Sequence, residues 1–401
     1  MAWQVDFTSE AFFRDPAAGI ASLRASGPVV ATRFPIIGKV WVTTTYETTA
    51  RVLKDSTIFT LRRDGTLAGL RWWMPKFVAT FANNMLTMDE PDHTRLRAIV
   101  DEAFRRRAVL DMEPRVRAIA DTLAGTLFVD GSPADLVERY ARMLPLSVIC
   151  ELLGLPPEDR PKFIAWANTM AHLTNAFGFL RRIRGLMRMR RYLEERLRLA
   201  RLHGGEGLIA ELVRVEQEGG RICASEMVSM VFLLLGAGTE TTTHLISGSV
   251  YELLKNPARR DWLAADWSRA GLAIEEFLRF VSPVQFSKPR FVRRDVELGG
   301  VRLRQGDRIM AMIAAANLDP AAHEQSAELD LARRPNRHIS FGTGIHFCLG
   351  HQLARIEAAC ALQALFTRWP GLRLAVEPGQ VRWRRRPGLR SIERLPVSAG
   401  A

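Results

Sequence analysis

The stretch "FGTGIHFCLG", residues 341–350, sets Cys348 among three glycines and a histidine, directly before a segment with helical periodicity. Glycines this dense indicate backbone that lies close to another group, and Gly342, Gly344 and Gly350 would let the loop press against a flat ligand. The thiolate is the form of cysteine that binds a metal, and a helix N-terminus lowers its pKa. The stretch therefore predicts a metal-binding thiolate at Cys348, with a small buried cysteine as the alternative.

A zinc cluster is a second interpretation of the same loop, because His346, Cys348 and His351 lie within six residues. Structural zinc takes four ligands, commonly in two spaced pairs. The sequence offers no second pair with suitable spacing, so a zinc site is the weaker of the two interpretations of this loop.

The length and composition are those of a globular enzyme. The chain has 401 residues, enough for a large core, and no repeats, low-complexity tracts or linkers, so we expect residues 1–401 to form one domain. The N-terminal segment has no secretory signal, and the longest apolar run, residues 230–238, is about half as long as a membrane span needs. The four cysteines are scattered, which argues against a disulfide framework. These features predict a cytoplasmic protein that does not bind a membrane.

The formal net charge of +13 comes mainly from arginine. Nucleic-acid binding would need basic residues interleaved with stacking aromatic residues, or a known reader motif, and the chain has neither. We therefore interpret the charge as a surface for an acidic protein partner, or as the arginine bias of a GC-rich bacterial genome.

The periodicity of the sequence predicts a mainly α fold with a smaller β portion from both ends of the chain. Residues 40–53 indicate a strand and a short helix, and residues 92–280 are mostly helical. After residue 283 the pattern changes to hairpins turned at "GG" and "QGD". A last long helix is expected from about Leu349 to Trp369.

The segment 225–254 predicts a long helix whose apolar stripe is interrupted by Gly238 and Thr241. Gly236 and Gly238 would open space beside this helix, and threonine hydroxyls that bond to the carbonyl four residues earlier would bend it. Glu240 sets an ionisable acid beside the hydroxyl of Thr241, which suits proton delivery to a bound oxygen species. The alternative is a kinked core helix with a solvated glutamate.

With these motifs the chain resembles the cytochromes P-450, haem-thiolate monooxygenases, of the soluble bacterial kind. Residues 341–350 match the family's FxxGxxxCxG loop, "AGTET" (237–241) its oxygen-activation motif, and "EEFLR" (275–279) its ExxR motif. The segments "DEPDHTRLR" (89–97), "KPRFVRRDVELGG" (288–300) and "LDLARRPNRHISFG" (329–342) also match, in family order. The resemblance covers nearly the whole chain, from about residue 40 to the last helix.

The resemblance implies that haem b lies between the long kinked helix and the loop of Cys348. Cys348 would be the axial ligand of the iron, and Glu240 and Thr241 would activate oxygen and deliver protons. A structural ion network would consist of Glu276, Arg279 and Arg333. The other cofactor-binding residues would be His93, Arg97, Gly238, Arg290, His338, Phe341, Gly342, His346 and Gly350.

The implied reaction inserts one atom of O2 into an organic substrate. Electrons would come from NAD(P)H through a reductase and a ferredoxin, since the chain has no room for a flavin domain. Arg62, Arg63, Arg71 or Lys76 could receive a substrate carboxylate, although solvated loop charges are the simpler account. The pocket itself would be apolar and aromatic, lined by Trp72, Trp73, Phe77, Leu173, Phe177, Leu233, Gly236, Ala237, Val284 and Phe286.

The chain departs from the family pattern at two positions outside the implied haem contacts. The common "ANRDP" reads "ANLDP", with Leu318 in place of arginine, and His323 stands where an aromatic residue is usual. The intact pair of Glu240 and Thr241 argues against a peroxide-driven enzyme or a haem-based sensor. A basic helical binding protein in which Cys348 is merely buried is a third interpretation, which a red colour of the purified protein would exclude.

An acidic ferredoxin would approach the iron from the side of Cys348. The resemblance assigns part of that surface to the helix after the HxxxR segment, which carries Arg105, Arg106 and Arg107, with Arg95 nearby. We expect this surface to attract ferredoxin by long-range electrostatics. A solvated basic face is the alternative.

Overall fold

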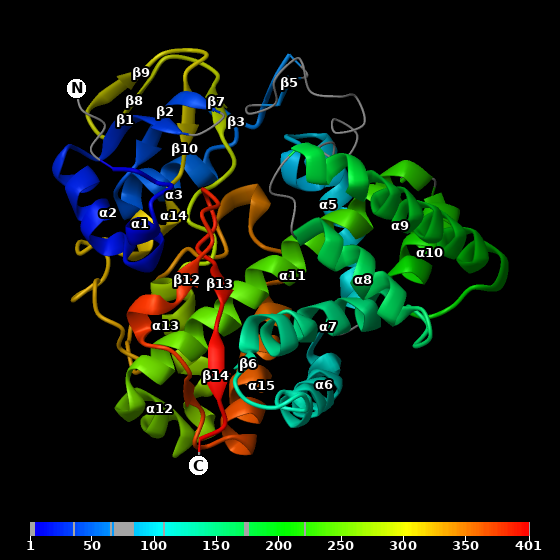
Figure 1. The fold of residues 1–401 in the computed structure, drawn as a ribbon. Coiled ribbons are helices and arrows are strands. Elements are labelled where there is room, and N and C mark those ends of the chain that lie inside the picture. The colour runs from blue at the N-terminus through cyan, green and yellow to red at the C-terminus, as the bar shows by residue number, and fades with distance from the viewer. Residues whose placement is uncertain are drawn as a thin grey trace.

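The computed structural model describes the backbone of residues 5–34, 37–64, 66–67, 84–106, 109–171, 176–219 and 222–400. It describes their side chains except at residues 66–67, 102–106, 109–110, 167–171, 176–184 and 186. Figure 1 shows that helices make up most of this part of the chain and that the strands come mainly from its two ends. The predicted fold class, mainly α with a smaller β portion, is therefore confirmed.

Most of the longer helices occupy the lower and right-hand parts of Figure 1, with α11 running through the middle, whereas α1, α2, α3 and α14 lie beside the sheet on the left. Among the described residues, no helix has the length and apolarity to span a bilayer. The helices are α1 (Glu10–Arg14), α2 (Pro16–Ala25), α3 (Tyr46–Lys54), α5 (Asp92–Arg106), α6 (Glu113–Thr126), α7 (Met143–Leu153), α8 (Arg160–Ala171), α9 (Ala176–His203), α10 (Leu208–Gly219), α11 (Ala224–Lys255), α12 (Pro257–Ala264), α13 (Ala270–Val281), α14 (Ile313–Asn317) and α15 (His351–Arg368).

The main sheet joins the two ends of the chain, in the strand order β1-β2-β10-β7-β3. β1 and β2 form an antiparallel hairpin, and β10 lies parallel to β2. The strands are β1 (Val29–Phe34), β2 (Gly38–Thr43), β3 (Phe59–Thr60), β4 (Arg62–Arg63), β5 (Thr66–Leu67), β6 (Ala134–Asp135), β7 (Arg290–Val292), β8 (Val296–Leu298), β9 (Val301–Leu303), β10 (Arg308–Met310), β11 (Arg373–Leu374), β12 (Arg382–Trp383), β13 (Ile392–Arg394) and β14 (Pro396–Ser398).

The hairpin predicted at "GG" is β8–β9, turned at Gly299 and Gly300. Both glycines have positive φ, +55° and +73°, a region that residues with a Cβ rarely adopt. A Cβ at Gly299 would also lie 2.8 Å from Pro28. The turn therefore requires glycine for conformation and for packing.

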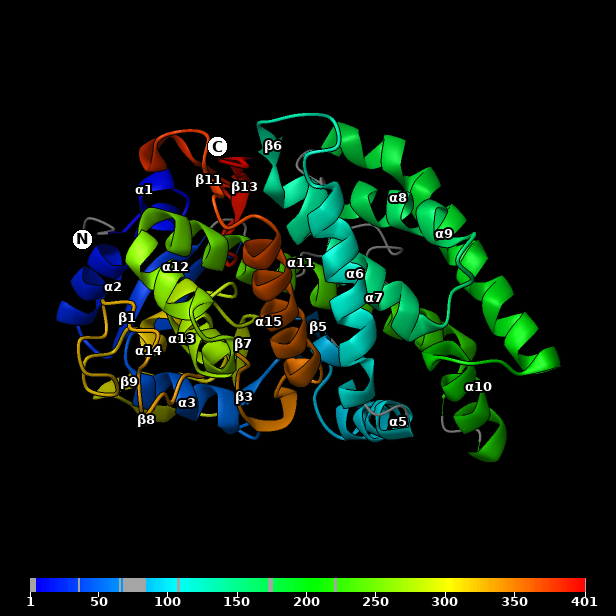
Figure 2. The same cartoon turned by 90° about the horizontal axis from the view of Figure 1, so that it is seen from below.

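The core is organised around α11, which packs against α7, α13 and α15. Figure 2 shows α15 beside α6 and close to α11, and helix contacts connect these three elements. Apolar side chains from the helices form the largest buried cluster, whereas two smaller clusters lie under the sheet. As a result, α11 and the start of α15 have fixed positions relative to each other.

One buried carboxyl in this core belongs to Glu357 on α15. It is 4% exposed, and its Oε2 atom has no hydrogen-bond partner among the described residues. Burial raises the pKa of Glu357 from 4.5 to about 8. A raised pKa means that the folded protein holds a proton which the unfolded chain releases. The contribution of Glu357 to the free energy of unfolding is therefore fully present below pH 4.5 and is lost as the pH rises toward 8.

Glu357→Gln should therefore stabilise the protein at pH 8 by about 1–3 kcal/mol and change little at pH 5. Glutamine has the shape of the protonated acid and releases no proton on unfolding. Urea unfolding of both proteins at pH 5, 6.5 and 8 measures the effect, with the exposed Glu158→Gln as control. Parallel pH profiles of the parent and Glu357→Gln would contradict this assignment.

Candidate active site

Cys348 lies in the loop between the short 3-10 turn Gly344–His346 and α15. Its backbone N–H donates a hydrogen bond to the carbonyl of Phe341 at 2.9 Å, which holds the loop closed. Burial raises the pKa of the Cys348 thiol, and the N–H of Gly350, Arg97 and Arg355 act in the opposite direction. Cys348 is half-buried and forms no disulfide, and the guanidinium groups of Arg97 and Arg355 lie close enough to act on its sulfur.

The three glycines of the loop have different roles. Gly342 and Gly344 have φ of +70° and +76°, and a Cβ at Gly344 would come within 2.6 Å of the carbonyl oxygen of Leu53 on α3. Gly344 is therefore required by the packing of α3 and by its own conformation. A Cβ at Gly350 would meet nothing within 4 Å. All three glycines were expected to leave room for a ligand, and Gly350 is the one that faces open space.

The middle of α11 lines an opening. Gly236, Ala237 and Gly238 are exposed, although they are flanked by buried residues of the same helix. A Cβ at either glycine would meet nothing within 4 Å. The hydroxyl of Thr241 donates to the carbonyl of Ala237 at 2.7 Å, which is the i−4 bond predicted from the sequence. The helix is continuous from Ala224 to Lys255, and Gly236 and Gly238 near its centre face open space.

Glu240 lies between a cation and a buried histidine. Arg386, from the loop between β12 and β13, donates a short hydrogen bond to Oε1 of Glu240. Nε2 of His244 lies 4.0 Å from the same oxygen, one helical turn further along. Burial opposes ionisation of Glu240, but His244, Arg386 and Arg384 outweigh it and hold its pKa below the usual value. Burial also lowers the pKa of His244, so this ring is neutral at pH 7.

Several buried nitrogens near the Cys348 loop have no partner in the described part of the chain. The rings of His93 and His346 are 4.3 Å apart, and Nδ1 of His93 and Nε2 of His346 are unpaired. Arg290 is 3% exposed, makes no salt bridge with a described residue and has an unpaired Nε. Burial lowers its pKa to about 10, with weak opposition from Asp89. A buried guanidinium in this state favours a ligand that carries an acid.

Arg97 and Phe341 border the same loop. Arg97 donates to the carbonyl of Phe347 at 2.7 Å and to both oxygens of Asp101 at 3.0 and 3.1 Å. The guanidinium of Arg355 lies 4.5 Å above the ring of Phe341. These contacts position the residues that flank Cys348.

His338 has protein partners at both ring nitrogens. Its Nδ1 accepts the N–H of Ser340 at 3.3 Å, so its Nε2 carries the proton and donates to Glu275 at 3.0 Å. The role of His338 toward a cofactor carboxylate stays a prediction.

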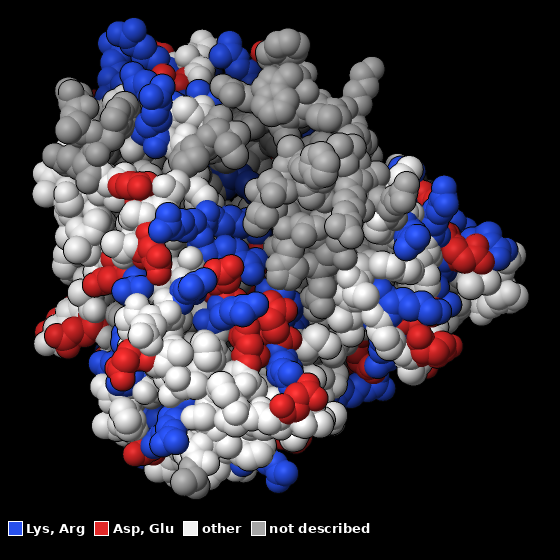
Figure 3. Space-filling model, in the orientation of Figure 1, with Lys and Arg blue, Asp and Glu red and all other residues white. Residues whose placement is uncertain are grey.

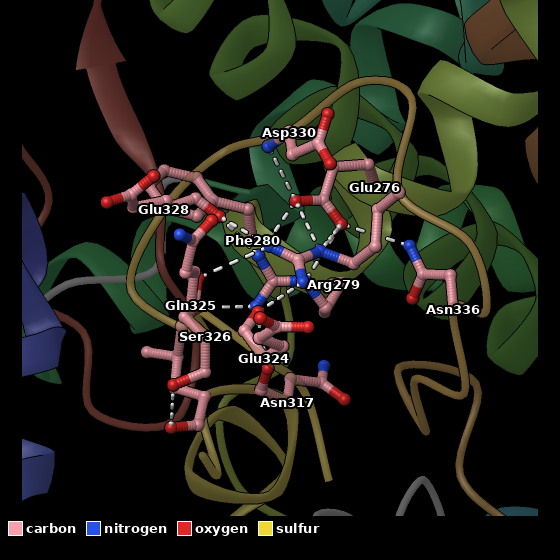
Figure 4. Close-up of polar contacts among 12 residues, drawn as sticks. Glu276, Arg279, Phe280, Asn317, Glu324, Gln325, Ser326, Glu328, Asp330 and Asn336 are labelled. Atoms are coloured by element: carbon pink, nitrogen blue, oxygen red, sulfur yellow. Dashed lines mark hydrogen bonds and ion pairs between the residues drawn. The ribbon is translucent and has the colours of Figure 1, made fainter.

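The predicted ion network is brought together around Glu276 and Arg279, which are both 0% exposed (Figure 4). Arg279 makes two 2.8 Å hydrogen bonds to Glu276, and its remaining N–H groups donate to the carbonyls of Asn317, Ser326 and Glu328. Arg333 bonds to both oxygens of Glu276 at 3.1 Å. The cluster thereby ties α13 to the segment that leads into the Cys348 loop.

The predicted substrate pocket is described only in part. Leu233 and Val284 are both half-buried, and Val284 packs against one of the two smaller core clusters at the sheet. Phe286 does not line the pocket. Its backbone bridges Met312, and its ring packs edge-on against Phe7 and Phe34 in the core under the sheet. Trp72, Trp73, Phe77, Leu173 and the side chain of Phe177 lie outside the described residues.

The predicted ferredoxin surface is likewise incomplete. The side chains of Arg105 and Arg106, and the whole of Arg107, lie outside the described residues. Arg95 is described, and it pairs with Glu226 at 2.6 Å. Arg95 therefore links α5 to the start of α11, and its charge is already paired with an acid of the same chain.

Sequence reasoning missed His244, Arg386 and Lys288. His244 lies four residues after Glu240 on one helix, a spacing that could have identified it. Arg386 is 146 residues away from Glu240, so no local pattern predicts their contact. Lys288 falls within a segment that matched the family, but Arg290 alone was selected from it.

Comparison with known proteins agrees with this geometry. The cytochrome P-450 family model matches residues 271–374. Vitamin D(3) 25-hydroxylase of Pseudonocardia autotrophica is 38% identical over 398 residues, which cover 99% of this chain and 97% of that protein. The structure of the bacillaene polyketide synthase cytochrome P-450 PksS of Bacillus subtilis superimposes with a TM-score of 0.89 at 33% identity, covering 99% and 100% of the two chains.

A second solved structure is similarly close. The myxobacterial cytochrome P-450 CYP267B1, in complex with myristic acid, superimposes with a TM-score of 0.88 at 36% identity over 98% of each chain. Similarity at this level extends over the whole fold, from the sheet to the Cys348 loop. The chain therefore belongs to the cytochrome P-450 family of haem-thiolate monooxygenases.

Proposed function

We propose that this monooxygenase inserts one atom of O2 into an organic substrate that lies beside α11, and that the thiolate of Cys348 would hold the iron of a haem. The observation that carries the proposal is the packing of α15, which begins just after the half-buried free Cys348, against α11, whose face at Gly236 and Gly238 is open. The unpaired nitrogens of His93, His346 and Arg290 fit a flat cofactor with carboxylate groups. Haem with a thiolate ligand supplies the oxygen-activating chemistry when bound.

The chain's own residues would transfer protons to the site beside α11. Thr241 presents a hydroxyl toward the opening and can exchange its bond to Ala237 for one to a ligand there. Glu240 is ionised and directly precedes Thr241 on α11, so it could accept a proton from solvent and pass it inward. His244 supports the carboxylate from the buried side.

Electrons would come from NAD(P)H through a ferredoxin reductase and an acidic ferredoxin. The net charge of +13 supports an acidic partner. An apolar substrate is supported by relatives, since one is named for hydroxylation of vitamin D3 and one neighbour binds myristic acid. Leu233 and the α11 glycines offer a lining with few polar groups.

Thr241→Ala tests the proposed proton path. We expect haem and substrate to bind normally, while product formed per NAD(P)H falls about two- to tenfold and peroxide rises, because the hydroxyl that directs the proton is lost. The control is Thr243→Ala. Thr243 makes the same i−4 bond at 2.8 Å on the same helix but is buried away from the opening. Unchanged coupling in Thr241→Ala would remove Thr241 from the mechanism.

A further inference from the structure

Lys288 has no ion pair with any residue that the structure describes. Its side chain is solvent-accessible, yet protein surrounds it closely, and this burial lowers its pKa together with Arg386, while Glu240 opposes the shift. Lys288 is thus exposed, yet Arg386 and Glu240 lie close enough to affect its pKa, and no described acid pairs with it directly.

The backbone brings Lys288 close to Arg386. Residues 283–285 run antiparallel to residues 388–390, held by a β-bridge and two backbone hydrogen bonds of 2.9 Å. Lys288 follows the first segment by three residues, and Arg386 precedes the second by two. Both residues therefore leave the paired stretch at the same end, where they interact electrostatically with each other and with Glu240 of α11.

Arg386 can bind a second acid without releasing the first. Only its Nη1 atom bonds to Glu240, and its other nitrogens have no partner in the described part of the chain. The side chain is 52% exposed. Figure 3 shows basic side chains over the upper part of the β12–β13 hairpin, at the edge of the hollow between the sheet and the helices.

The charges here are unbalanced. Glu240 is the acidic group that interacts with both Lys288 and Arg386, and His244 is neutral. Arg384 is a further cation near Glu240, and Glu393 and Glu138 also act on it, so its charge is partly balanced by these two acids. A lysine and an arginine that converge on one point bind a carboxylate through charge-assisted hydrogen bonds.

We propose that Lys288 and Arg386 bind a carboxylate of the substrate at the edge of the opening beside α11. The substrate would then have an apolar body, which enters the space along Gly236–Gly238, and one anionic end. The inference rests on the proposed monooxygenase function and adds a substrate class to it.

Ligand-induced shifts in the haem spectrum of the holoenzyme at pH 7.5 test this inference. The probes are dodecanoic acid and 4-phenylbutanoic acid, each compared with its own methyl ester. In the parent, each acid should bind at least about tenfold more tightly than its ester. Lys288→Met and Arg386→Gln should each reduce this acid-to-ester ratio several-fold, mainly by weakening acid binding.

Arg385→Gln is the matched control. Arg385 lies in the same loop, is 68% exposed and is 3.6 Å from Glu10, so its loss should leave the ratio unchanged. Equal binding of acids and esters by the parent would overturn the inference. If the esters are nonetheless oxidised, the monooxygenase function stands and only the substrate class fails.

A carboxylate of the cofactor is the other possible source of the anion. In that case Lys288→Met would speed haem loss to apomyoglobin and leave the acid-to-ester ratio unchanged. This result would also overturn the inference. We expect instead that both variants lose the preference for the acid over its ester, while the rate of haem loss stays that of the parent.

Discussion

Cys348→Ala protein is expected to lose the red-shifted Soret band that thiolate-bound haem shows with carbon monoxide after reduction, and to lose all detectable product formation. A thiolate at Cys348 would donate electron density to a haem iron held there, and this donation gives thiolate-bound haem its oxygen-activating chemistry. The histidines near this loop, His346 and His351, are neutral bases that lack this donor strength. The reduced carbon monoxide spectrum and product yield are the measurements.

Two further variants make this result specific. Cys360→Ala removes a buried thiol from α15, the helix that follows the Cys348 loop, and should keep the parent spectrum. Cys348→Ser preserves the size of the side chain, so loss of the band there separates the loss of sulfur from a distorted loop. An unchanged spectrum in Cys348→Ala would refute the proposed ligand and the proposed function with it.

The features that sequence predicted well are local. The hairpin at Gly299–Gly300 depends on two adjacent residues with positive φ, and the ion pair of Glu276 and Arg279 depends on i,i+3 spacing in one helix. Turn chemistry and helical periodicity are properties of a few neighbouring residues. Such features can therefore be identified before any tertiary contact is known.

The features that sequence missed depend on contacts between distant segments. Gly344 was interpreted as a ligand contact, but the backbone of α3, about 290 residues earlier, is what excludes a side chain there. Phe286 matched a pocket segment but turned into the core beneath the sheet. The contact of Arg386 with Glu240 arises because the β12–β13 loop pairs with residues 283–285. Family order could place these segments near the site without giving their side-chain directions.

The second large effect is expected at the buried network of Glu276. Its carboxylate accepts hydrogen bonds from Arg279, Arg333, Asn336 and the N–H of Asp330, all between 2.8 and 3.1 Å. With 0% exposure, water cannot replace any of these partners. Removing one partner of a buried pair leaves an uncompensated charge, which costs more than the pair itself contributes.

Glu276→Gln should therefore lower the free energy of unfolding by about 3–5 kcal/mol, because two buried guanidinium groups lose the one anion that they share among the described residues. The chain offers a matched control in Glu195 and Arg198, an i,i+3 pair with two hydrogen bonds of 2.6 and 2.8 Å that lies exposed on α9. Glu195→Gln should be indistinguishable from the parent in urea unfolding, since solvent screens this pair. Equal effects of the two substitutions would show that the network around Glu276 does not stabilise the fold through its charge. If only Glu276→Gln lowers the free energy of unfolding strongly, then the stabilisation comes from the burial of the ion pair and not from its i,i+3 spacing, which both pairs share.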